Sequence, residues 1–185
     1  MPSEPALQAN SKSATWQDGA RAVSPLIFGV APFGLVFGVT AIAADVPTIA
    51  AWASSFIVFA GASQIAIVEL MDGGGTPVIA LVTAIVINAR HLMYSADMGR
   101  YTVSVPLRTK AGVGYLLTDQ AYLVTANRFP DPTLGRGTIA FYFGGAVALW
   151  TTWQITTTAG MVLGAAIPES WSLEFAIPLT FMALL

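Results

Sequence analysis

The sequence predicts an all-α protein, a polytopic integral membrane helical bundle with broken or re-entrant helices. Hydrophobic residues make up 55% and charged residues 10% of its 185 positions, whereas a soluble domain has about 25% charged residues. The mean hydropathy is +0.68. Apolar segments close to spanning length also recur along the chain, and several contain Gly, Pro or buried polar residues.

Composition excludes several functional classes. The net charge of −2 is small and the basic residues are dispersed, so we expect no nucleic-acid binding. Without cysteine there is no disulfide or thiol chemistry, and a single histidine makes the usual zinc sites improbable. We therefore expect no metal and no cofactor. The sequence has no P-loop, so an active transporter would use an ion or proton gradient.

Two regions are expected. Residues 1–17 are polar and lack an apolar period, which predicts a disordered cytoplasmic leader. Residues 18–185 are expected to form a single transmembrane domain. A sixth apolar segment begins near Leu173 and stops at Leu185 without a cap or flanking charge, so we expect the domain to be truncated at its C-terminus.

The first apolar segment runs from about Ala20 to Ala44. Pro25 and Pro32 remove backbone donors, so we expect this helix to be kinked or partly unwound. Gly34 and Gly38 form a small-xxx-small face. We expect that face to serve close helix packing rather than direct contact with a substrate.

The second segment, Thr48 to about Leu70, carries Gly61, Ala62, Ser63 and Gln64 in its second half. Small residues let the backbone approach another helix or a ligand, and a buried glutamine needs hydrogen-bond partners. An interhelical hydrogen bond and a substrate contact both remain open for Gln64. A glycine-rich loop ends the segment.

The third segment begins at Pro77, a favourable first residue of a helix, but has only a short apolar run before Asn88. It either continues to about Met98 or is a half-helix. A charged side chain facing hydrocarbon costs at least ~2.5–3.5 kcal/mol, so its polar part must be enclosed by protein, line a wet cavity or lie at the boundary. On a helix, one face would carry Asn88, His91 and Ser95, and the opposite face Arg90, Tyr94 and Asp97.

The fourth segment, Gly112 to about Asn127, has the weakest apolar pattern. Helical spacing would place Tyr115, Asp119 and Tyr122 on one face, with the carboxylate between two phenols. A carboxylate inside the membrane is a functional hypothesis by default, and a salt bridge to Arg90 is the structural alternative.

The fifth segment, Thr138 to about Ala166, is a long span. Its threonines are expected to bond their own helix backbone. Gly160-Met-Val-Leu-Gly164 echoes Gly34-Leu-Val-Phe-Gly38, which makes an internal repeat, common in transporters, a candidate.

The basic residues create a conflict over topology. Lys12 and Arg21 favour a cytoplasmic N-terminus, and the basic loop expected from Arg100 to Lys110 favours the same side. Three full spans between them would place them on opposite sides. One of the first three segments is therefore expected to be re-entrant, and the short third segment is the strongest candidate.

Several motifs together resemble the AzlC-like permeases, the large subunits of two-component branched-chain amino acid exporters. The resemblance covers about Gly19 to Leu185. It departs at Gln120, where family members often have glutamate, and at the C-terminus, where the family's last helices are missing. The motifs are Pro32-Phe-Gly-Leu-Val-Phe-Gly38, Phe59-Ala-Gly-Ala-Ser-Gln64, Asn88-Ala-Arg-His-Leu-Met-Tyr94, Leu117-Thr-Asp-Gln-Ala-Tyr122 and Ile167-Pro with Leu173-Glu-Phe-Ala-Ile-Pro-Leu179.

This resemblance implies export of branched-chain amino acids, often methionine too, across the bacterial inner (cytoplasmic) membrane by a multi-pass protein. It also implies a partner, a small multispanning AzlD-like subunit. A higher oligomer is left open.

A zwitterionic amino acid needs donors for its carboxylate, an acceptor for its ammonium and an apolar pocket. We expect the carboxylate near Asn88 and a broken helix at Gly61, Ala62, Ser63 and Gln64. Asp119 would hold the ammonium or a coupling proton, helped by Tyr115 and Tyr122. Arg90 would neutralise Asp119 or Asp97 when the site is empty. His91 is either a structural residue or a proton relay.

Two other classes remain open. A channel or a transporter for another small solute would use the same buried polar residues. An intramembrane hydrolase could use Ser63, His91 and Asp119, but Ser63 lacks a nucleophile-elbow context.

Overall fold

The computed structural model describes residues 14–131 and 136–166, and all regular secondary structure in these ranges is helical. Two described helices, Trp16–Ala43 and Pro77–Tyr101, are long and apolar enough to cross a membrane. These findings confirm the predicted fold class. The expectations for residues 1–13 and for the sixth apolar segment lie outside the described residues.

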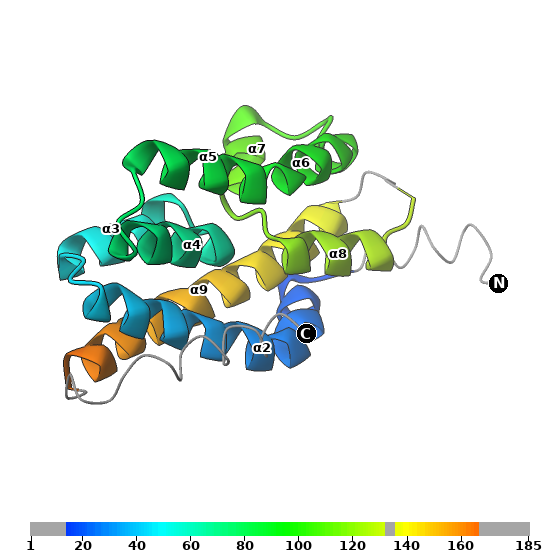
Figure 1. The fold of residues 1–185 in the computed structure, drawn as a ribbon. Helices are drawn as coiled ribbons and strands as arrows, with labels where there is room; N and C mark the ends of the chain where they lie inside the picture. The colour runs from blue at the N-terminus through cyan, green and yellow to red at the C-terminus, as the bar shows by residue number, and fades with distance from the viewer. Residues whose placement is uncertain (1–13, 132–135, 167–185) are drawn as a thin grey trace. The chain divides into compact units, whose positions relative to one another are not determined.

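The predicted second, third and fourth segments are each divided into two helices (Figure 1). The chain falls into two compact units, unit 1 with Met1–Leu26 and Arg90–Trp150, and unit 2 with Ile27–Ala89 and Thr151–Leu185. The helices are α2 (Trp16–Ala43), α3 (Thr48–Ile57), α4 (Gly61–Asp72), α5 (Pro77–Asn88), α6 (Arg90–Tyr101), α7 (Leu107–Tyr115), α8 (Asp119–Arg128) and α9 (Arg136–Ala166).

Helix α2 begins with a capping box. The Thr15 N–H donates to the Asp18 carboxylate at 2.8 Å, and the Asp18 N–H donates back to the Thr15 hydroxyl at 3.3 Å. The helix then runs through Pro25 and Pro32 without interruption, so it is not partly unwound there, and the other alternative, a kink, stays a prediction. Each proline removes only its own N–H donor, and the rest of the backbone ladder persists.

In unit 2, glycines let α2 and α9 approach closely. A Cβ added to Gly38 would lie 2.3 Å from the Thr157 carbonyl oxygen, and one added to Gly160 would lie 2.2 Å from the Leu35 carbonyl oxygen. The two GxxxG motifs therefore pack against each other, as the packing interpretation of Gly34 and Gly38 predicts.

The same contacts give the relative direction of these helices. Gly34 meets Thr156, Gly38 meets Gly160, and Gly164 meets Val39. Because the contact positions ascend along both helices, α2 and α9 run parallel within unit 2.

The chain reverses between α3 and α4. Gln64 Nε2 donates to Ser54 Oγ at 2.9 Å. On an uninterrupted helix these two residues would be about 15 Å apart along the axis, too far for such a bond. The turn lies at Phe59, whose φ of 43° is in the left-handed region. Segment two is therefore a pair of half-helices that folds back on itself.

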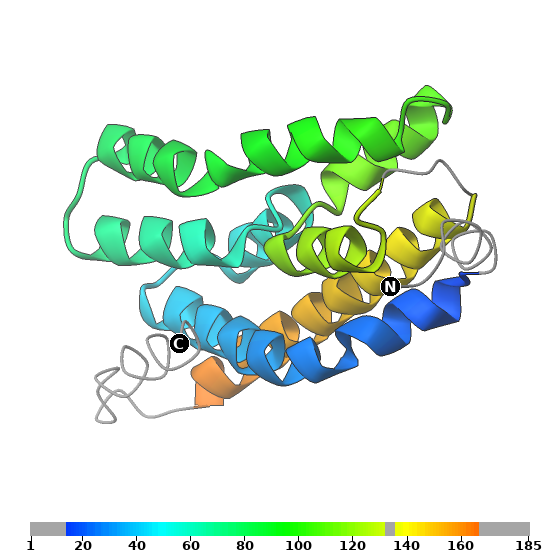
Figure 2. The same ribbon diagram turned by 90° about the vertical axis from the view of Figure 1, so that its right-hand side faces the viewer.

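Helices α4 and α5 then lie side by side, joined by a loop at residues 73–76 (Figure 2). The Thr76 hydroxyl accepts the Ile79 N–H at 3.4 Å, and Pro77 occupies the first helical position. At the other end of this antiparallel pair, Asn88 Nδ2 donates to Ser63 Oγ at 2.9 Å.

In unit 1, helices α6 and α8 run parallel. Arg90 contacts Asp119 at the start of both helices, and the Tyr101 hydroxyl reaches the Phe129 carbonyl oxygen at their ends, at 2.6 Å. Helix α7 begins only a short turn after Tyr101. Helix α7 must therefore run antiparallel to α6, toward the end of α6 at which Arg90 lies. The chain then reverses at residues 116–118, and α8 runs parallel to α6.

This arrangement corrects the sequence analysis in three places. Pro77–Tyr101 is a candidate span of 25 residues, so its length and hydropathy do not require a re-entrant third segment. Segments two and four each reverse within one unit. The stretch Arg100 to Lys110 is not one loop either, since α6 ends at Tyr101 and α7 begins at Leu107.

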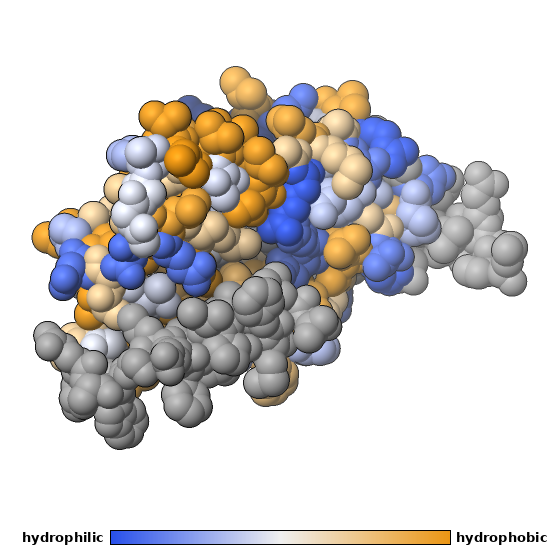
Figure 3. All heavy atoms as spheres, viewed as in Figure 1, coloured by the Kyte–Doolittle hydropathy of each residue, from blue (hydrophilic) through white to orange (hydrophobic). Residues whose placement is uncertain are grey.

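The outer side of α5 is strongly apolar. Figure 3 shows hydrophobic side chains gathered over this helix. Such a surface is unfavourable in water and suits contact with lipid chains or other membrane helices. Its exposed members are Val78, Ile79, Leu81, Val82, Ile85 and Val86.

Candidate functional site

The first candidate site is the helix interruption of unit 2. Phe59 is buried, and Ala60 is the N-cap of α4 but provides no side-chain cap. Gly61 and Ala62 follow in the first turn and are partly accessible. The first N–H groups of a helix have no partner within it and carry partial positive charge, so this turn is suited to an anionic group.

Ser63 and Gln64 hold the interruption together. The Ser63 hydroxyl donates to the Ala60 carbonyl oxygen at 2.9 Å and accepts from Asn88. Gln64 Oε1 accepts the Ala60 N–H at 3.1 Å, while its Nε2 donates to Ser54. Both Ser63 and Gln64 are buried. The sequence-predicted residues of this unit are thus brought together, with Gln64 in the interhelical bond that was one of its two interpretations.

Trp153 of α9 is a site residue that sequence reasoning missed. A Cβ on Gly61 would lie 2.4 Å from its ring, and Phe37 stacks on it with ring centroids 5.9 Å apart. Phe33 lies tilted at 6.1 Å. Its indole Nε1 is buried and has no hydrogen-bond partner among the described residues. Trp150 precedes it by three positions in the same apolar segment, and no sequence pattern indicates which of the two tryptophans lies at the interruption.

An open groove of about 710 Å³ also lies in unit 2, and its lining is almost wholly apolar. Gln154 reaches it and donates from Nε2 to the Ser55 carbonyl oxygen at 3.0 Å. The groove can accommodate apolar groups, but it offers few donors for a carboxylate. Its lining residues are Trp52, Phe56, Gln154, Ile155, Thr158, Ala159, Val162 and Leu163.

The second candidate site is in unit 1, where α6 meets α8. Arg90 Nη1 lies 3.0 Å from Asp119 Oδ2, with the two side chains 42% and 25% exposed. Asp119 occupies the first turn of α8, where the helix dipole favours a negative charge. Its other oxygen, Oδ1, is buried without a hydrogen-bond partner among the described residues, so the carboxylate retains acceptor capacity.

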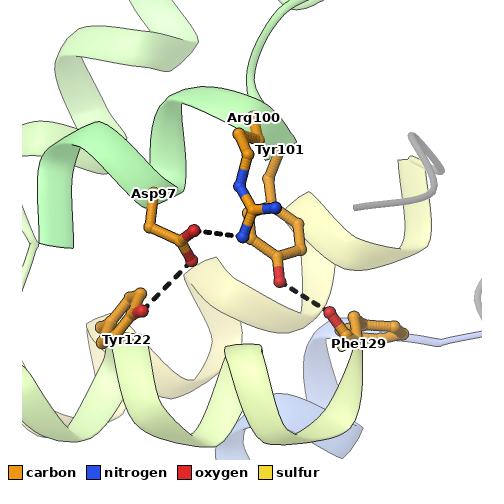
Figure 4. Close-up of polar contacts among 5 residues, drawn as sticks. All are labelled: Asp97, Arg100, Tyr101, Tyr122 and Phe129. Carbon is orange, nitrogen blue, oxygen red and sulfur yellow. Dashed lines mark hydrogen bonds and ion pairs between the residues drawn. The ribbon is translucent and has the colours of Figure 1, made fainter. Parts of the chain in front are cut away.

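Further along the same two helices, Tyr94 stacks on Tyr122 with ring centroids 4.6 Å apart. The Tyr122 hydroxyl donates to Asp97 at 3.1 Å, and Arg100 pairs with the other Asp97 oxygen (Figure 4). Arg90, Tyr94 and Asp97, the predicted shared face, therefore all contact residues of α8. Arg90 neutralises Asp119 rather than Asp97.

Tyr115 lies elsewhere. The reversal at residues 116–118 separates it from α8, and its hydroxyl accepts the Trp150 indole N–H at 3.2 Å. The prediction that Asp119 lies between two phenols on one helix face was wrong, because that spacing assumed an unbroken helix. His91 packs its ring edge-on against Tyr94 at 6.0 Å.

The geometry offers little to a hydrolase. The hydrogen bonds of the Ser63 hydroxyl within the described ranges go to Ala60 and Asn88, so no base activates it there. In residues 14–131 and 136–166, no three His, Cys, Asp or Glu side chains are grouped to hold a metal ion.

Comparison with known proteins identifies the family. The family model described as AzlC protein matches residues 25–167. The chain belongs to the AzlC family. The match contains both helix reversals and the α6–α8 contact, so the two candidate sites lie in the part that the family shares.

Two relatives of this AzlC-family chain are membrane proteins by name. Inner membrane protein YgaZ of Escherichia coli (strain K12) is 25% identical, and the alignment covers 98% of this chain and 76% of the relative. An uncharacterized membrane protein of Archaeoglobus fulgidus is 27% identical, with coverage of 97% and 78%. No solved structure matches this chain. Together with the apolar helices, these relatives make the chain a membrane protein.

Proposed function

We propose that this AzlC-family chain is the large subunit of a secondary transporter that exports branched-chain amino acids, and methionine too, from the cytoplasm. The observation that carries the proposal is the helix interruption at Phe59 and Ala60, inside an apolar segment. Transporters bind substrates at such interruptions, where half-helix ends supply charge and hydrogen bonds without ionised side chains. The bacterial inner membrane is the proposed location.

The substrate carboxylate binds at the first turn of α4. The Gly61 and Ala62 N–H groups and the Asn88 amide supply donors, and Ser63 with Gln64 keeps the turn in place. The buried Trp153 Nε1 adds a further donor, because its ring already lies against Gly61.

The aromatic cluster of Phe33, Phe37 and Trp153 at the same position gives a branched aliphatic side chain an apolar surrounding. Burial of such a side chain is worth roughly 1.5–3 kcal/mol. This free energy of apolar burial favours leucine, isoleucine, valine and methionine over polar amino acids.

In unit 1, Asp119 carries a coupling proton. Arg90 compensates its charge when the proton is absent, because the two groups form an ion pair in this structure. Since the Asp119 Oδ1 atom has no hydrogen-bond partner in the described ranges, it offers an acceptor for that proton.

The proposal includes a partner, a small multispanning subunit, as the family resemblance implies. The test is efflux of preloaded labelled leucine from bacteria that lack their own leucine exporters. Cells would express this chain with the small subunit, each alone, or neither. The proposal is supported if the efflux saturates, requires both subunits and stops when the ion gradients are collapsed.

The same experiment addresses the main alternative, a channel or a transporter for another solute. Flux that does not saturate and ignores the gradients would indicate a channel. Absence of leucine flux, with both subunits present in the membrane, would exclude a leucine exporter.

A further inference from the structure

The basic residues of this chain are segregated. All 8 Lys and Arg residues of the sequence fall in the residue ranges of unit 1, and none in those of unit 2. Basic residues near the ends of membrane spans face the cytoplasm. The α6–α7 turn and the C-terminal ends of α6 and α8, which carry Arg100, Arg108, Lys110 and Arg128, are therefore expected on the cytoplasmic side. This placement also removes the topology conflict, since segment two reverses instead of crossing.

Several of these cations already have partners within unit 1. Arg90 pairs with Asp119, Arg100 pairs with Asp97, and Arg128 lies 5.4 Å from the Phe129 ring centroid. Arg108 and Lys110, at the start of α7, are exposed and have no ion pair among the described residues. These two side chains are available to an external anion.

The same turn exposes large apolar side chains. Val103 is 66% and Leu107 is 80% exposed. The turn that carries them is fixed, because Tyr101 is buried and bonds to the Phe129 carbonyl oxygen, and the Thr102 hydroxyl donates to the Met98 carbonyl oxygen at 3.2 Å. An apolar side chain next to a basic one matches the boundary between acyl chains and headgroups.

We propose that the α6–α7 turn binds anionic phospholipid headgroups of the cytoplasmic leaflet. Val103 and Leu107 enter the acyl region, while Arg108 and Lys110 contact the phosphates. Charge favours an anionic lipid over a zwitterionic one, because unit 1 offers uncompensated positive charge here. This inference concerns a surface separate from both candidate transport sites.

The test is native mass spectrometry of the purified chain with phosphatidylglycerol or phosphatidylcholine of equal chain length. We expect preferential retention of phosphatidylglycerol, and a loss of that preference by roughly fivefold for each charge removed in Arg108→Gln and Lys110→Gln. The exchange variant Arg108→Lys with Lys110→Arg keeps both charges and should behave as wild type.

Equal retention of the two lipids by the wild type, or an unchanged preference in the double Gln variant, would overturn the proposal. If the double variant does not fold, the test uses the salt dependence of lipid binding by the wild type alone. Its preference for phosphatidylglycerol must fall as salt is raised, since exposed charges are screened. A salt-independent preference would contradict a headgroup contact through Arg108 and Lys110.

Discussion

The guanidinium of Arg90 lies 3.0 Å from the carboxylate of Asp119, and this pair joins the first turns of two parallel helices. The contact links the family motif that contains Arg90 with the one that contains Asp119. In a membrane, neither charge is stable without the other or a substitute such as a proton, an ammonium or water.

The first prediction concerns this pair. Asp119→Asn should abolish gradient-driven leucine efflux, because the amide cannot carry a coupling proton. It should also lower stability, since Arg90 loses its counter-ion. Arg90→Gln combined with Asp119→Asn should recover that stability, with a coupling of roughly 0.5–1 kcal/mol because both side chains are partly exposed. Efflux and thermal unfolding of the purified variants check this. Undiminished efflux by folded Asp119→Asn would remove Asp119 from the mechanism.

The second prediction concerns the helix contact in unit 2. Gly38→Ala should destabilise the protein by about 1–3 kcal/mol, because the new methyl group meets the backbone of α9. Gly29→Ala is the matched control on the same helix, where a Cβ meets nothing within 4 Å. That control should be neutral or slightly stabilising, since alanine favours a helix. Thermal unfolding in detergent measures both. Equal effects of the two changes would contradict the glycine interface.

The third prediction concerns Tyr122. Tyr122→Phe removes the hydrogen bond to Asp97 but keeps an aromatic ring to stack on Tyr94. We expect a loss of about 0.5–1.5 kcal/mol in the free energy of unfolding. Tyr115→Phe serves for comparison and should have a smaller effect, because Tyr115 is 47% exposed. Chemical denaturation gives the two values, and the reverse order would show that the Asp97 contact contributes little.

The fourth prediction concerns Trp153. If its indole N–H donates to the substrate carboxylate, Trp153→Phe should raise the KM for leucine by about tenfold or more, as expected for one hydrogen bond to a charged group. Stability should change less, because Nε1 has no partner among the described residues. Trp150→Phe, on the same helix, loses a bond to Tyr115 instead and should keep the KM. Uptake of labelled leucine into inside-out vesicles gives these values, and an unchanged KM in Trp153→Phe would exclude this donor.

Sequence reasoning located the polar residues but misplaced some of their neighbours. The prediction that Arg90, Tyr94 and Asp97 share one helix face was confirmed, since all three contact α8; those positions lie within one helix, and helical spacing is local. The joint face of Tyr115, Asp119 and Tyr122 was wrong, because the chain reverses between the first two. Tyr115 therefore lies beside Trp150.

The sequence by itself determined that this chain is an all-α membrane protein. It also determined that the glycine-rich faces of the first and fifth segments pack closely, since hydropathy and glycine spacing are properties of consecutive positions. Only the tertiary structure decided which segments reverse and which partner each polar group takes. A reversal depends on hydrogen bonds such as Gln64 to Ser54 and on contacts such as Arg90 to Asp119. Those bonds join residues 10 or more positions apart, and no local pattern specifies them.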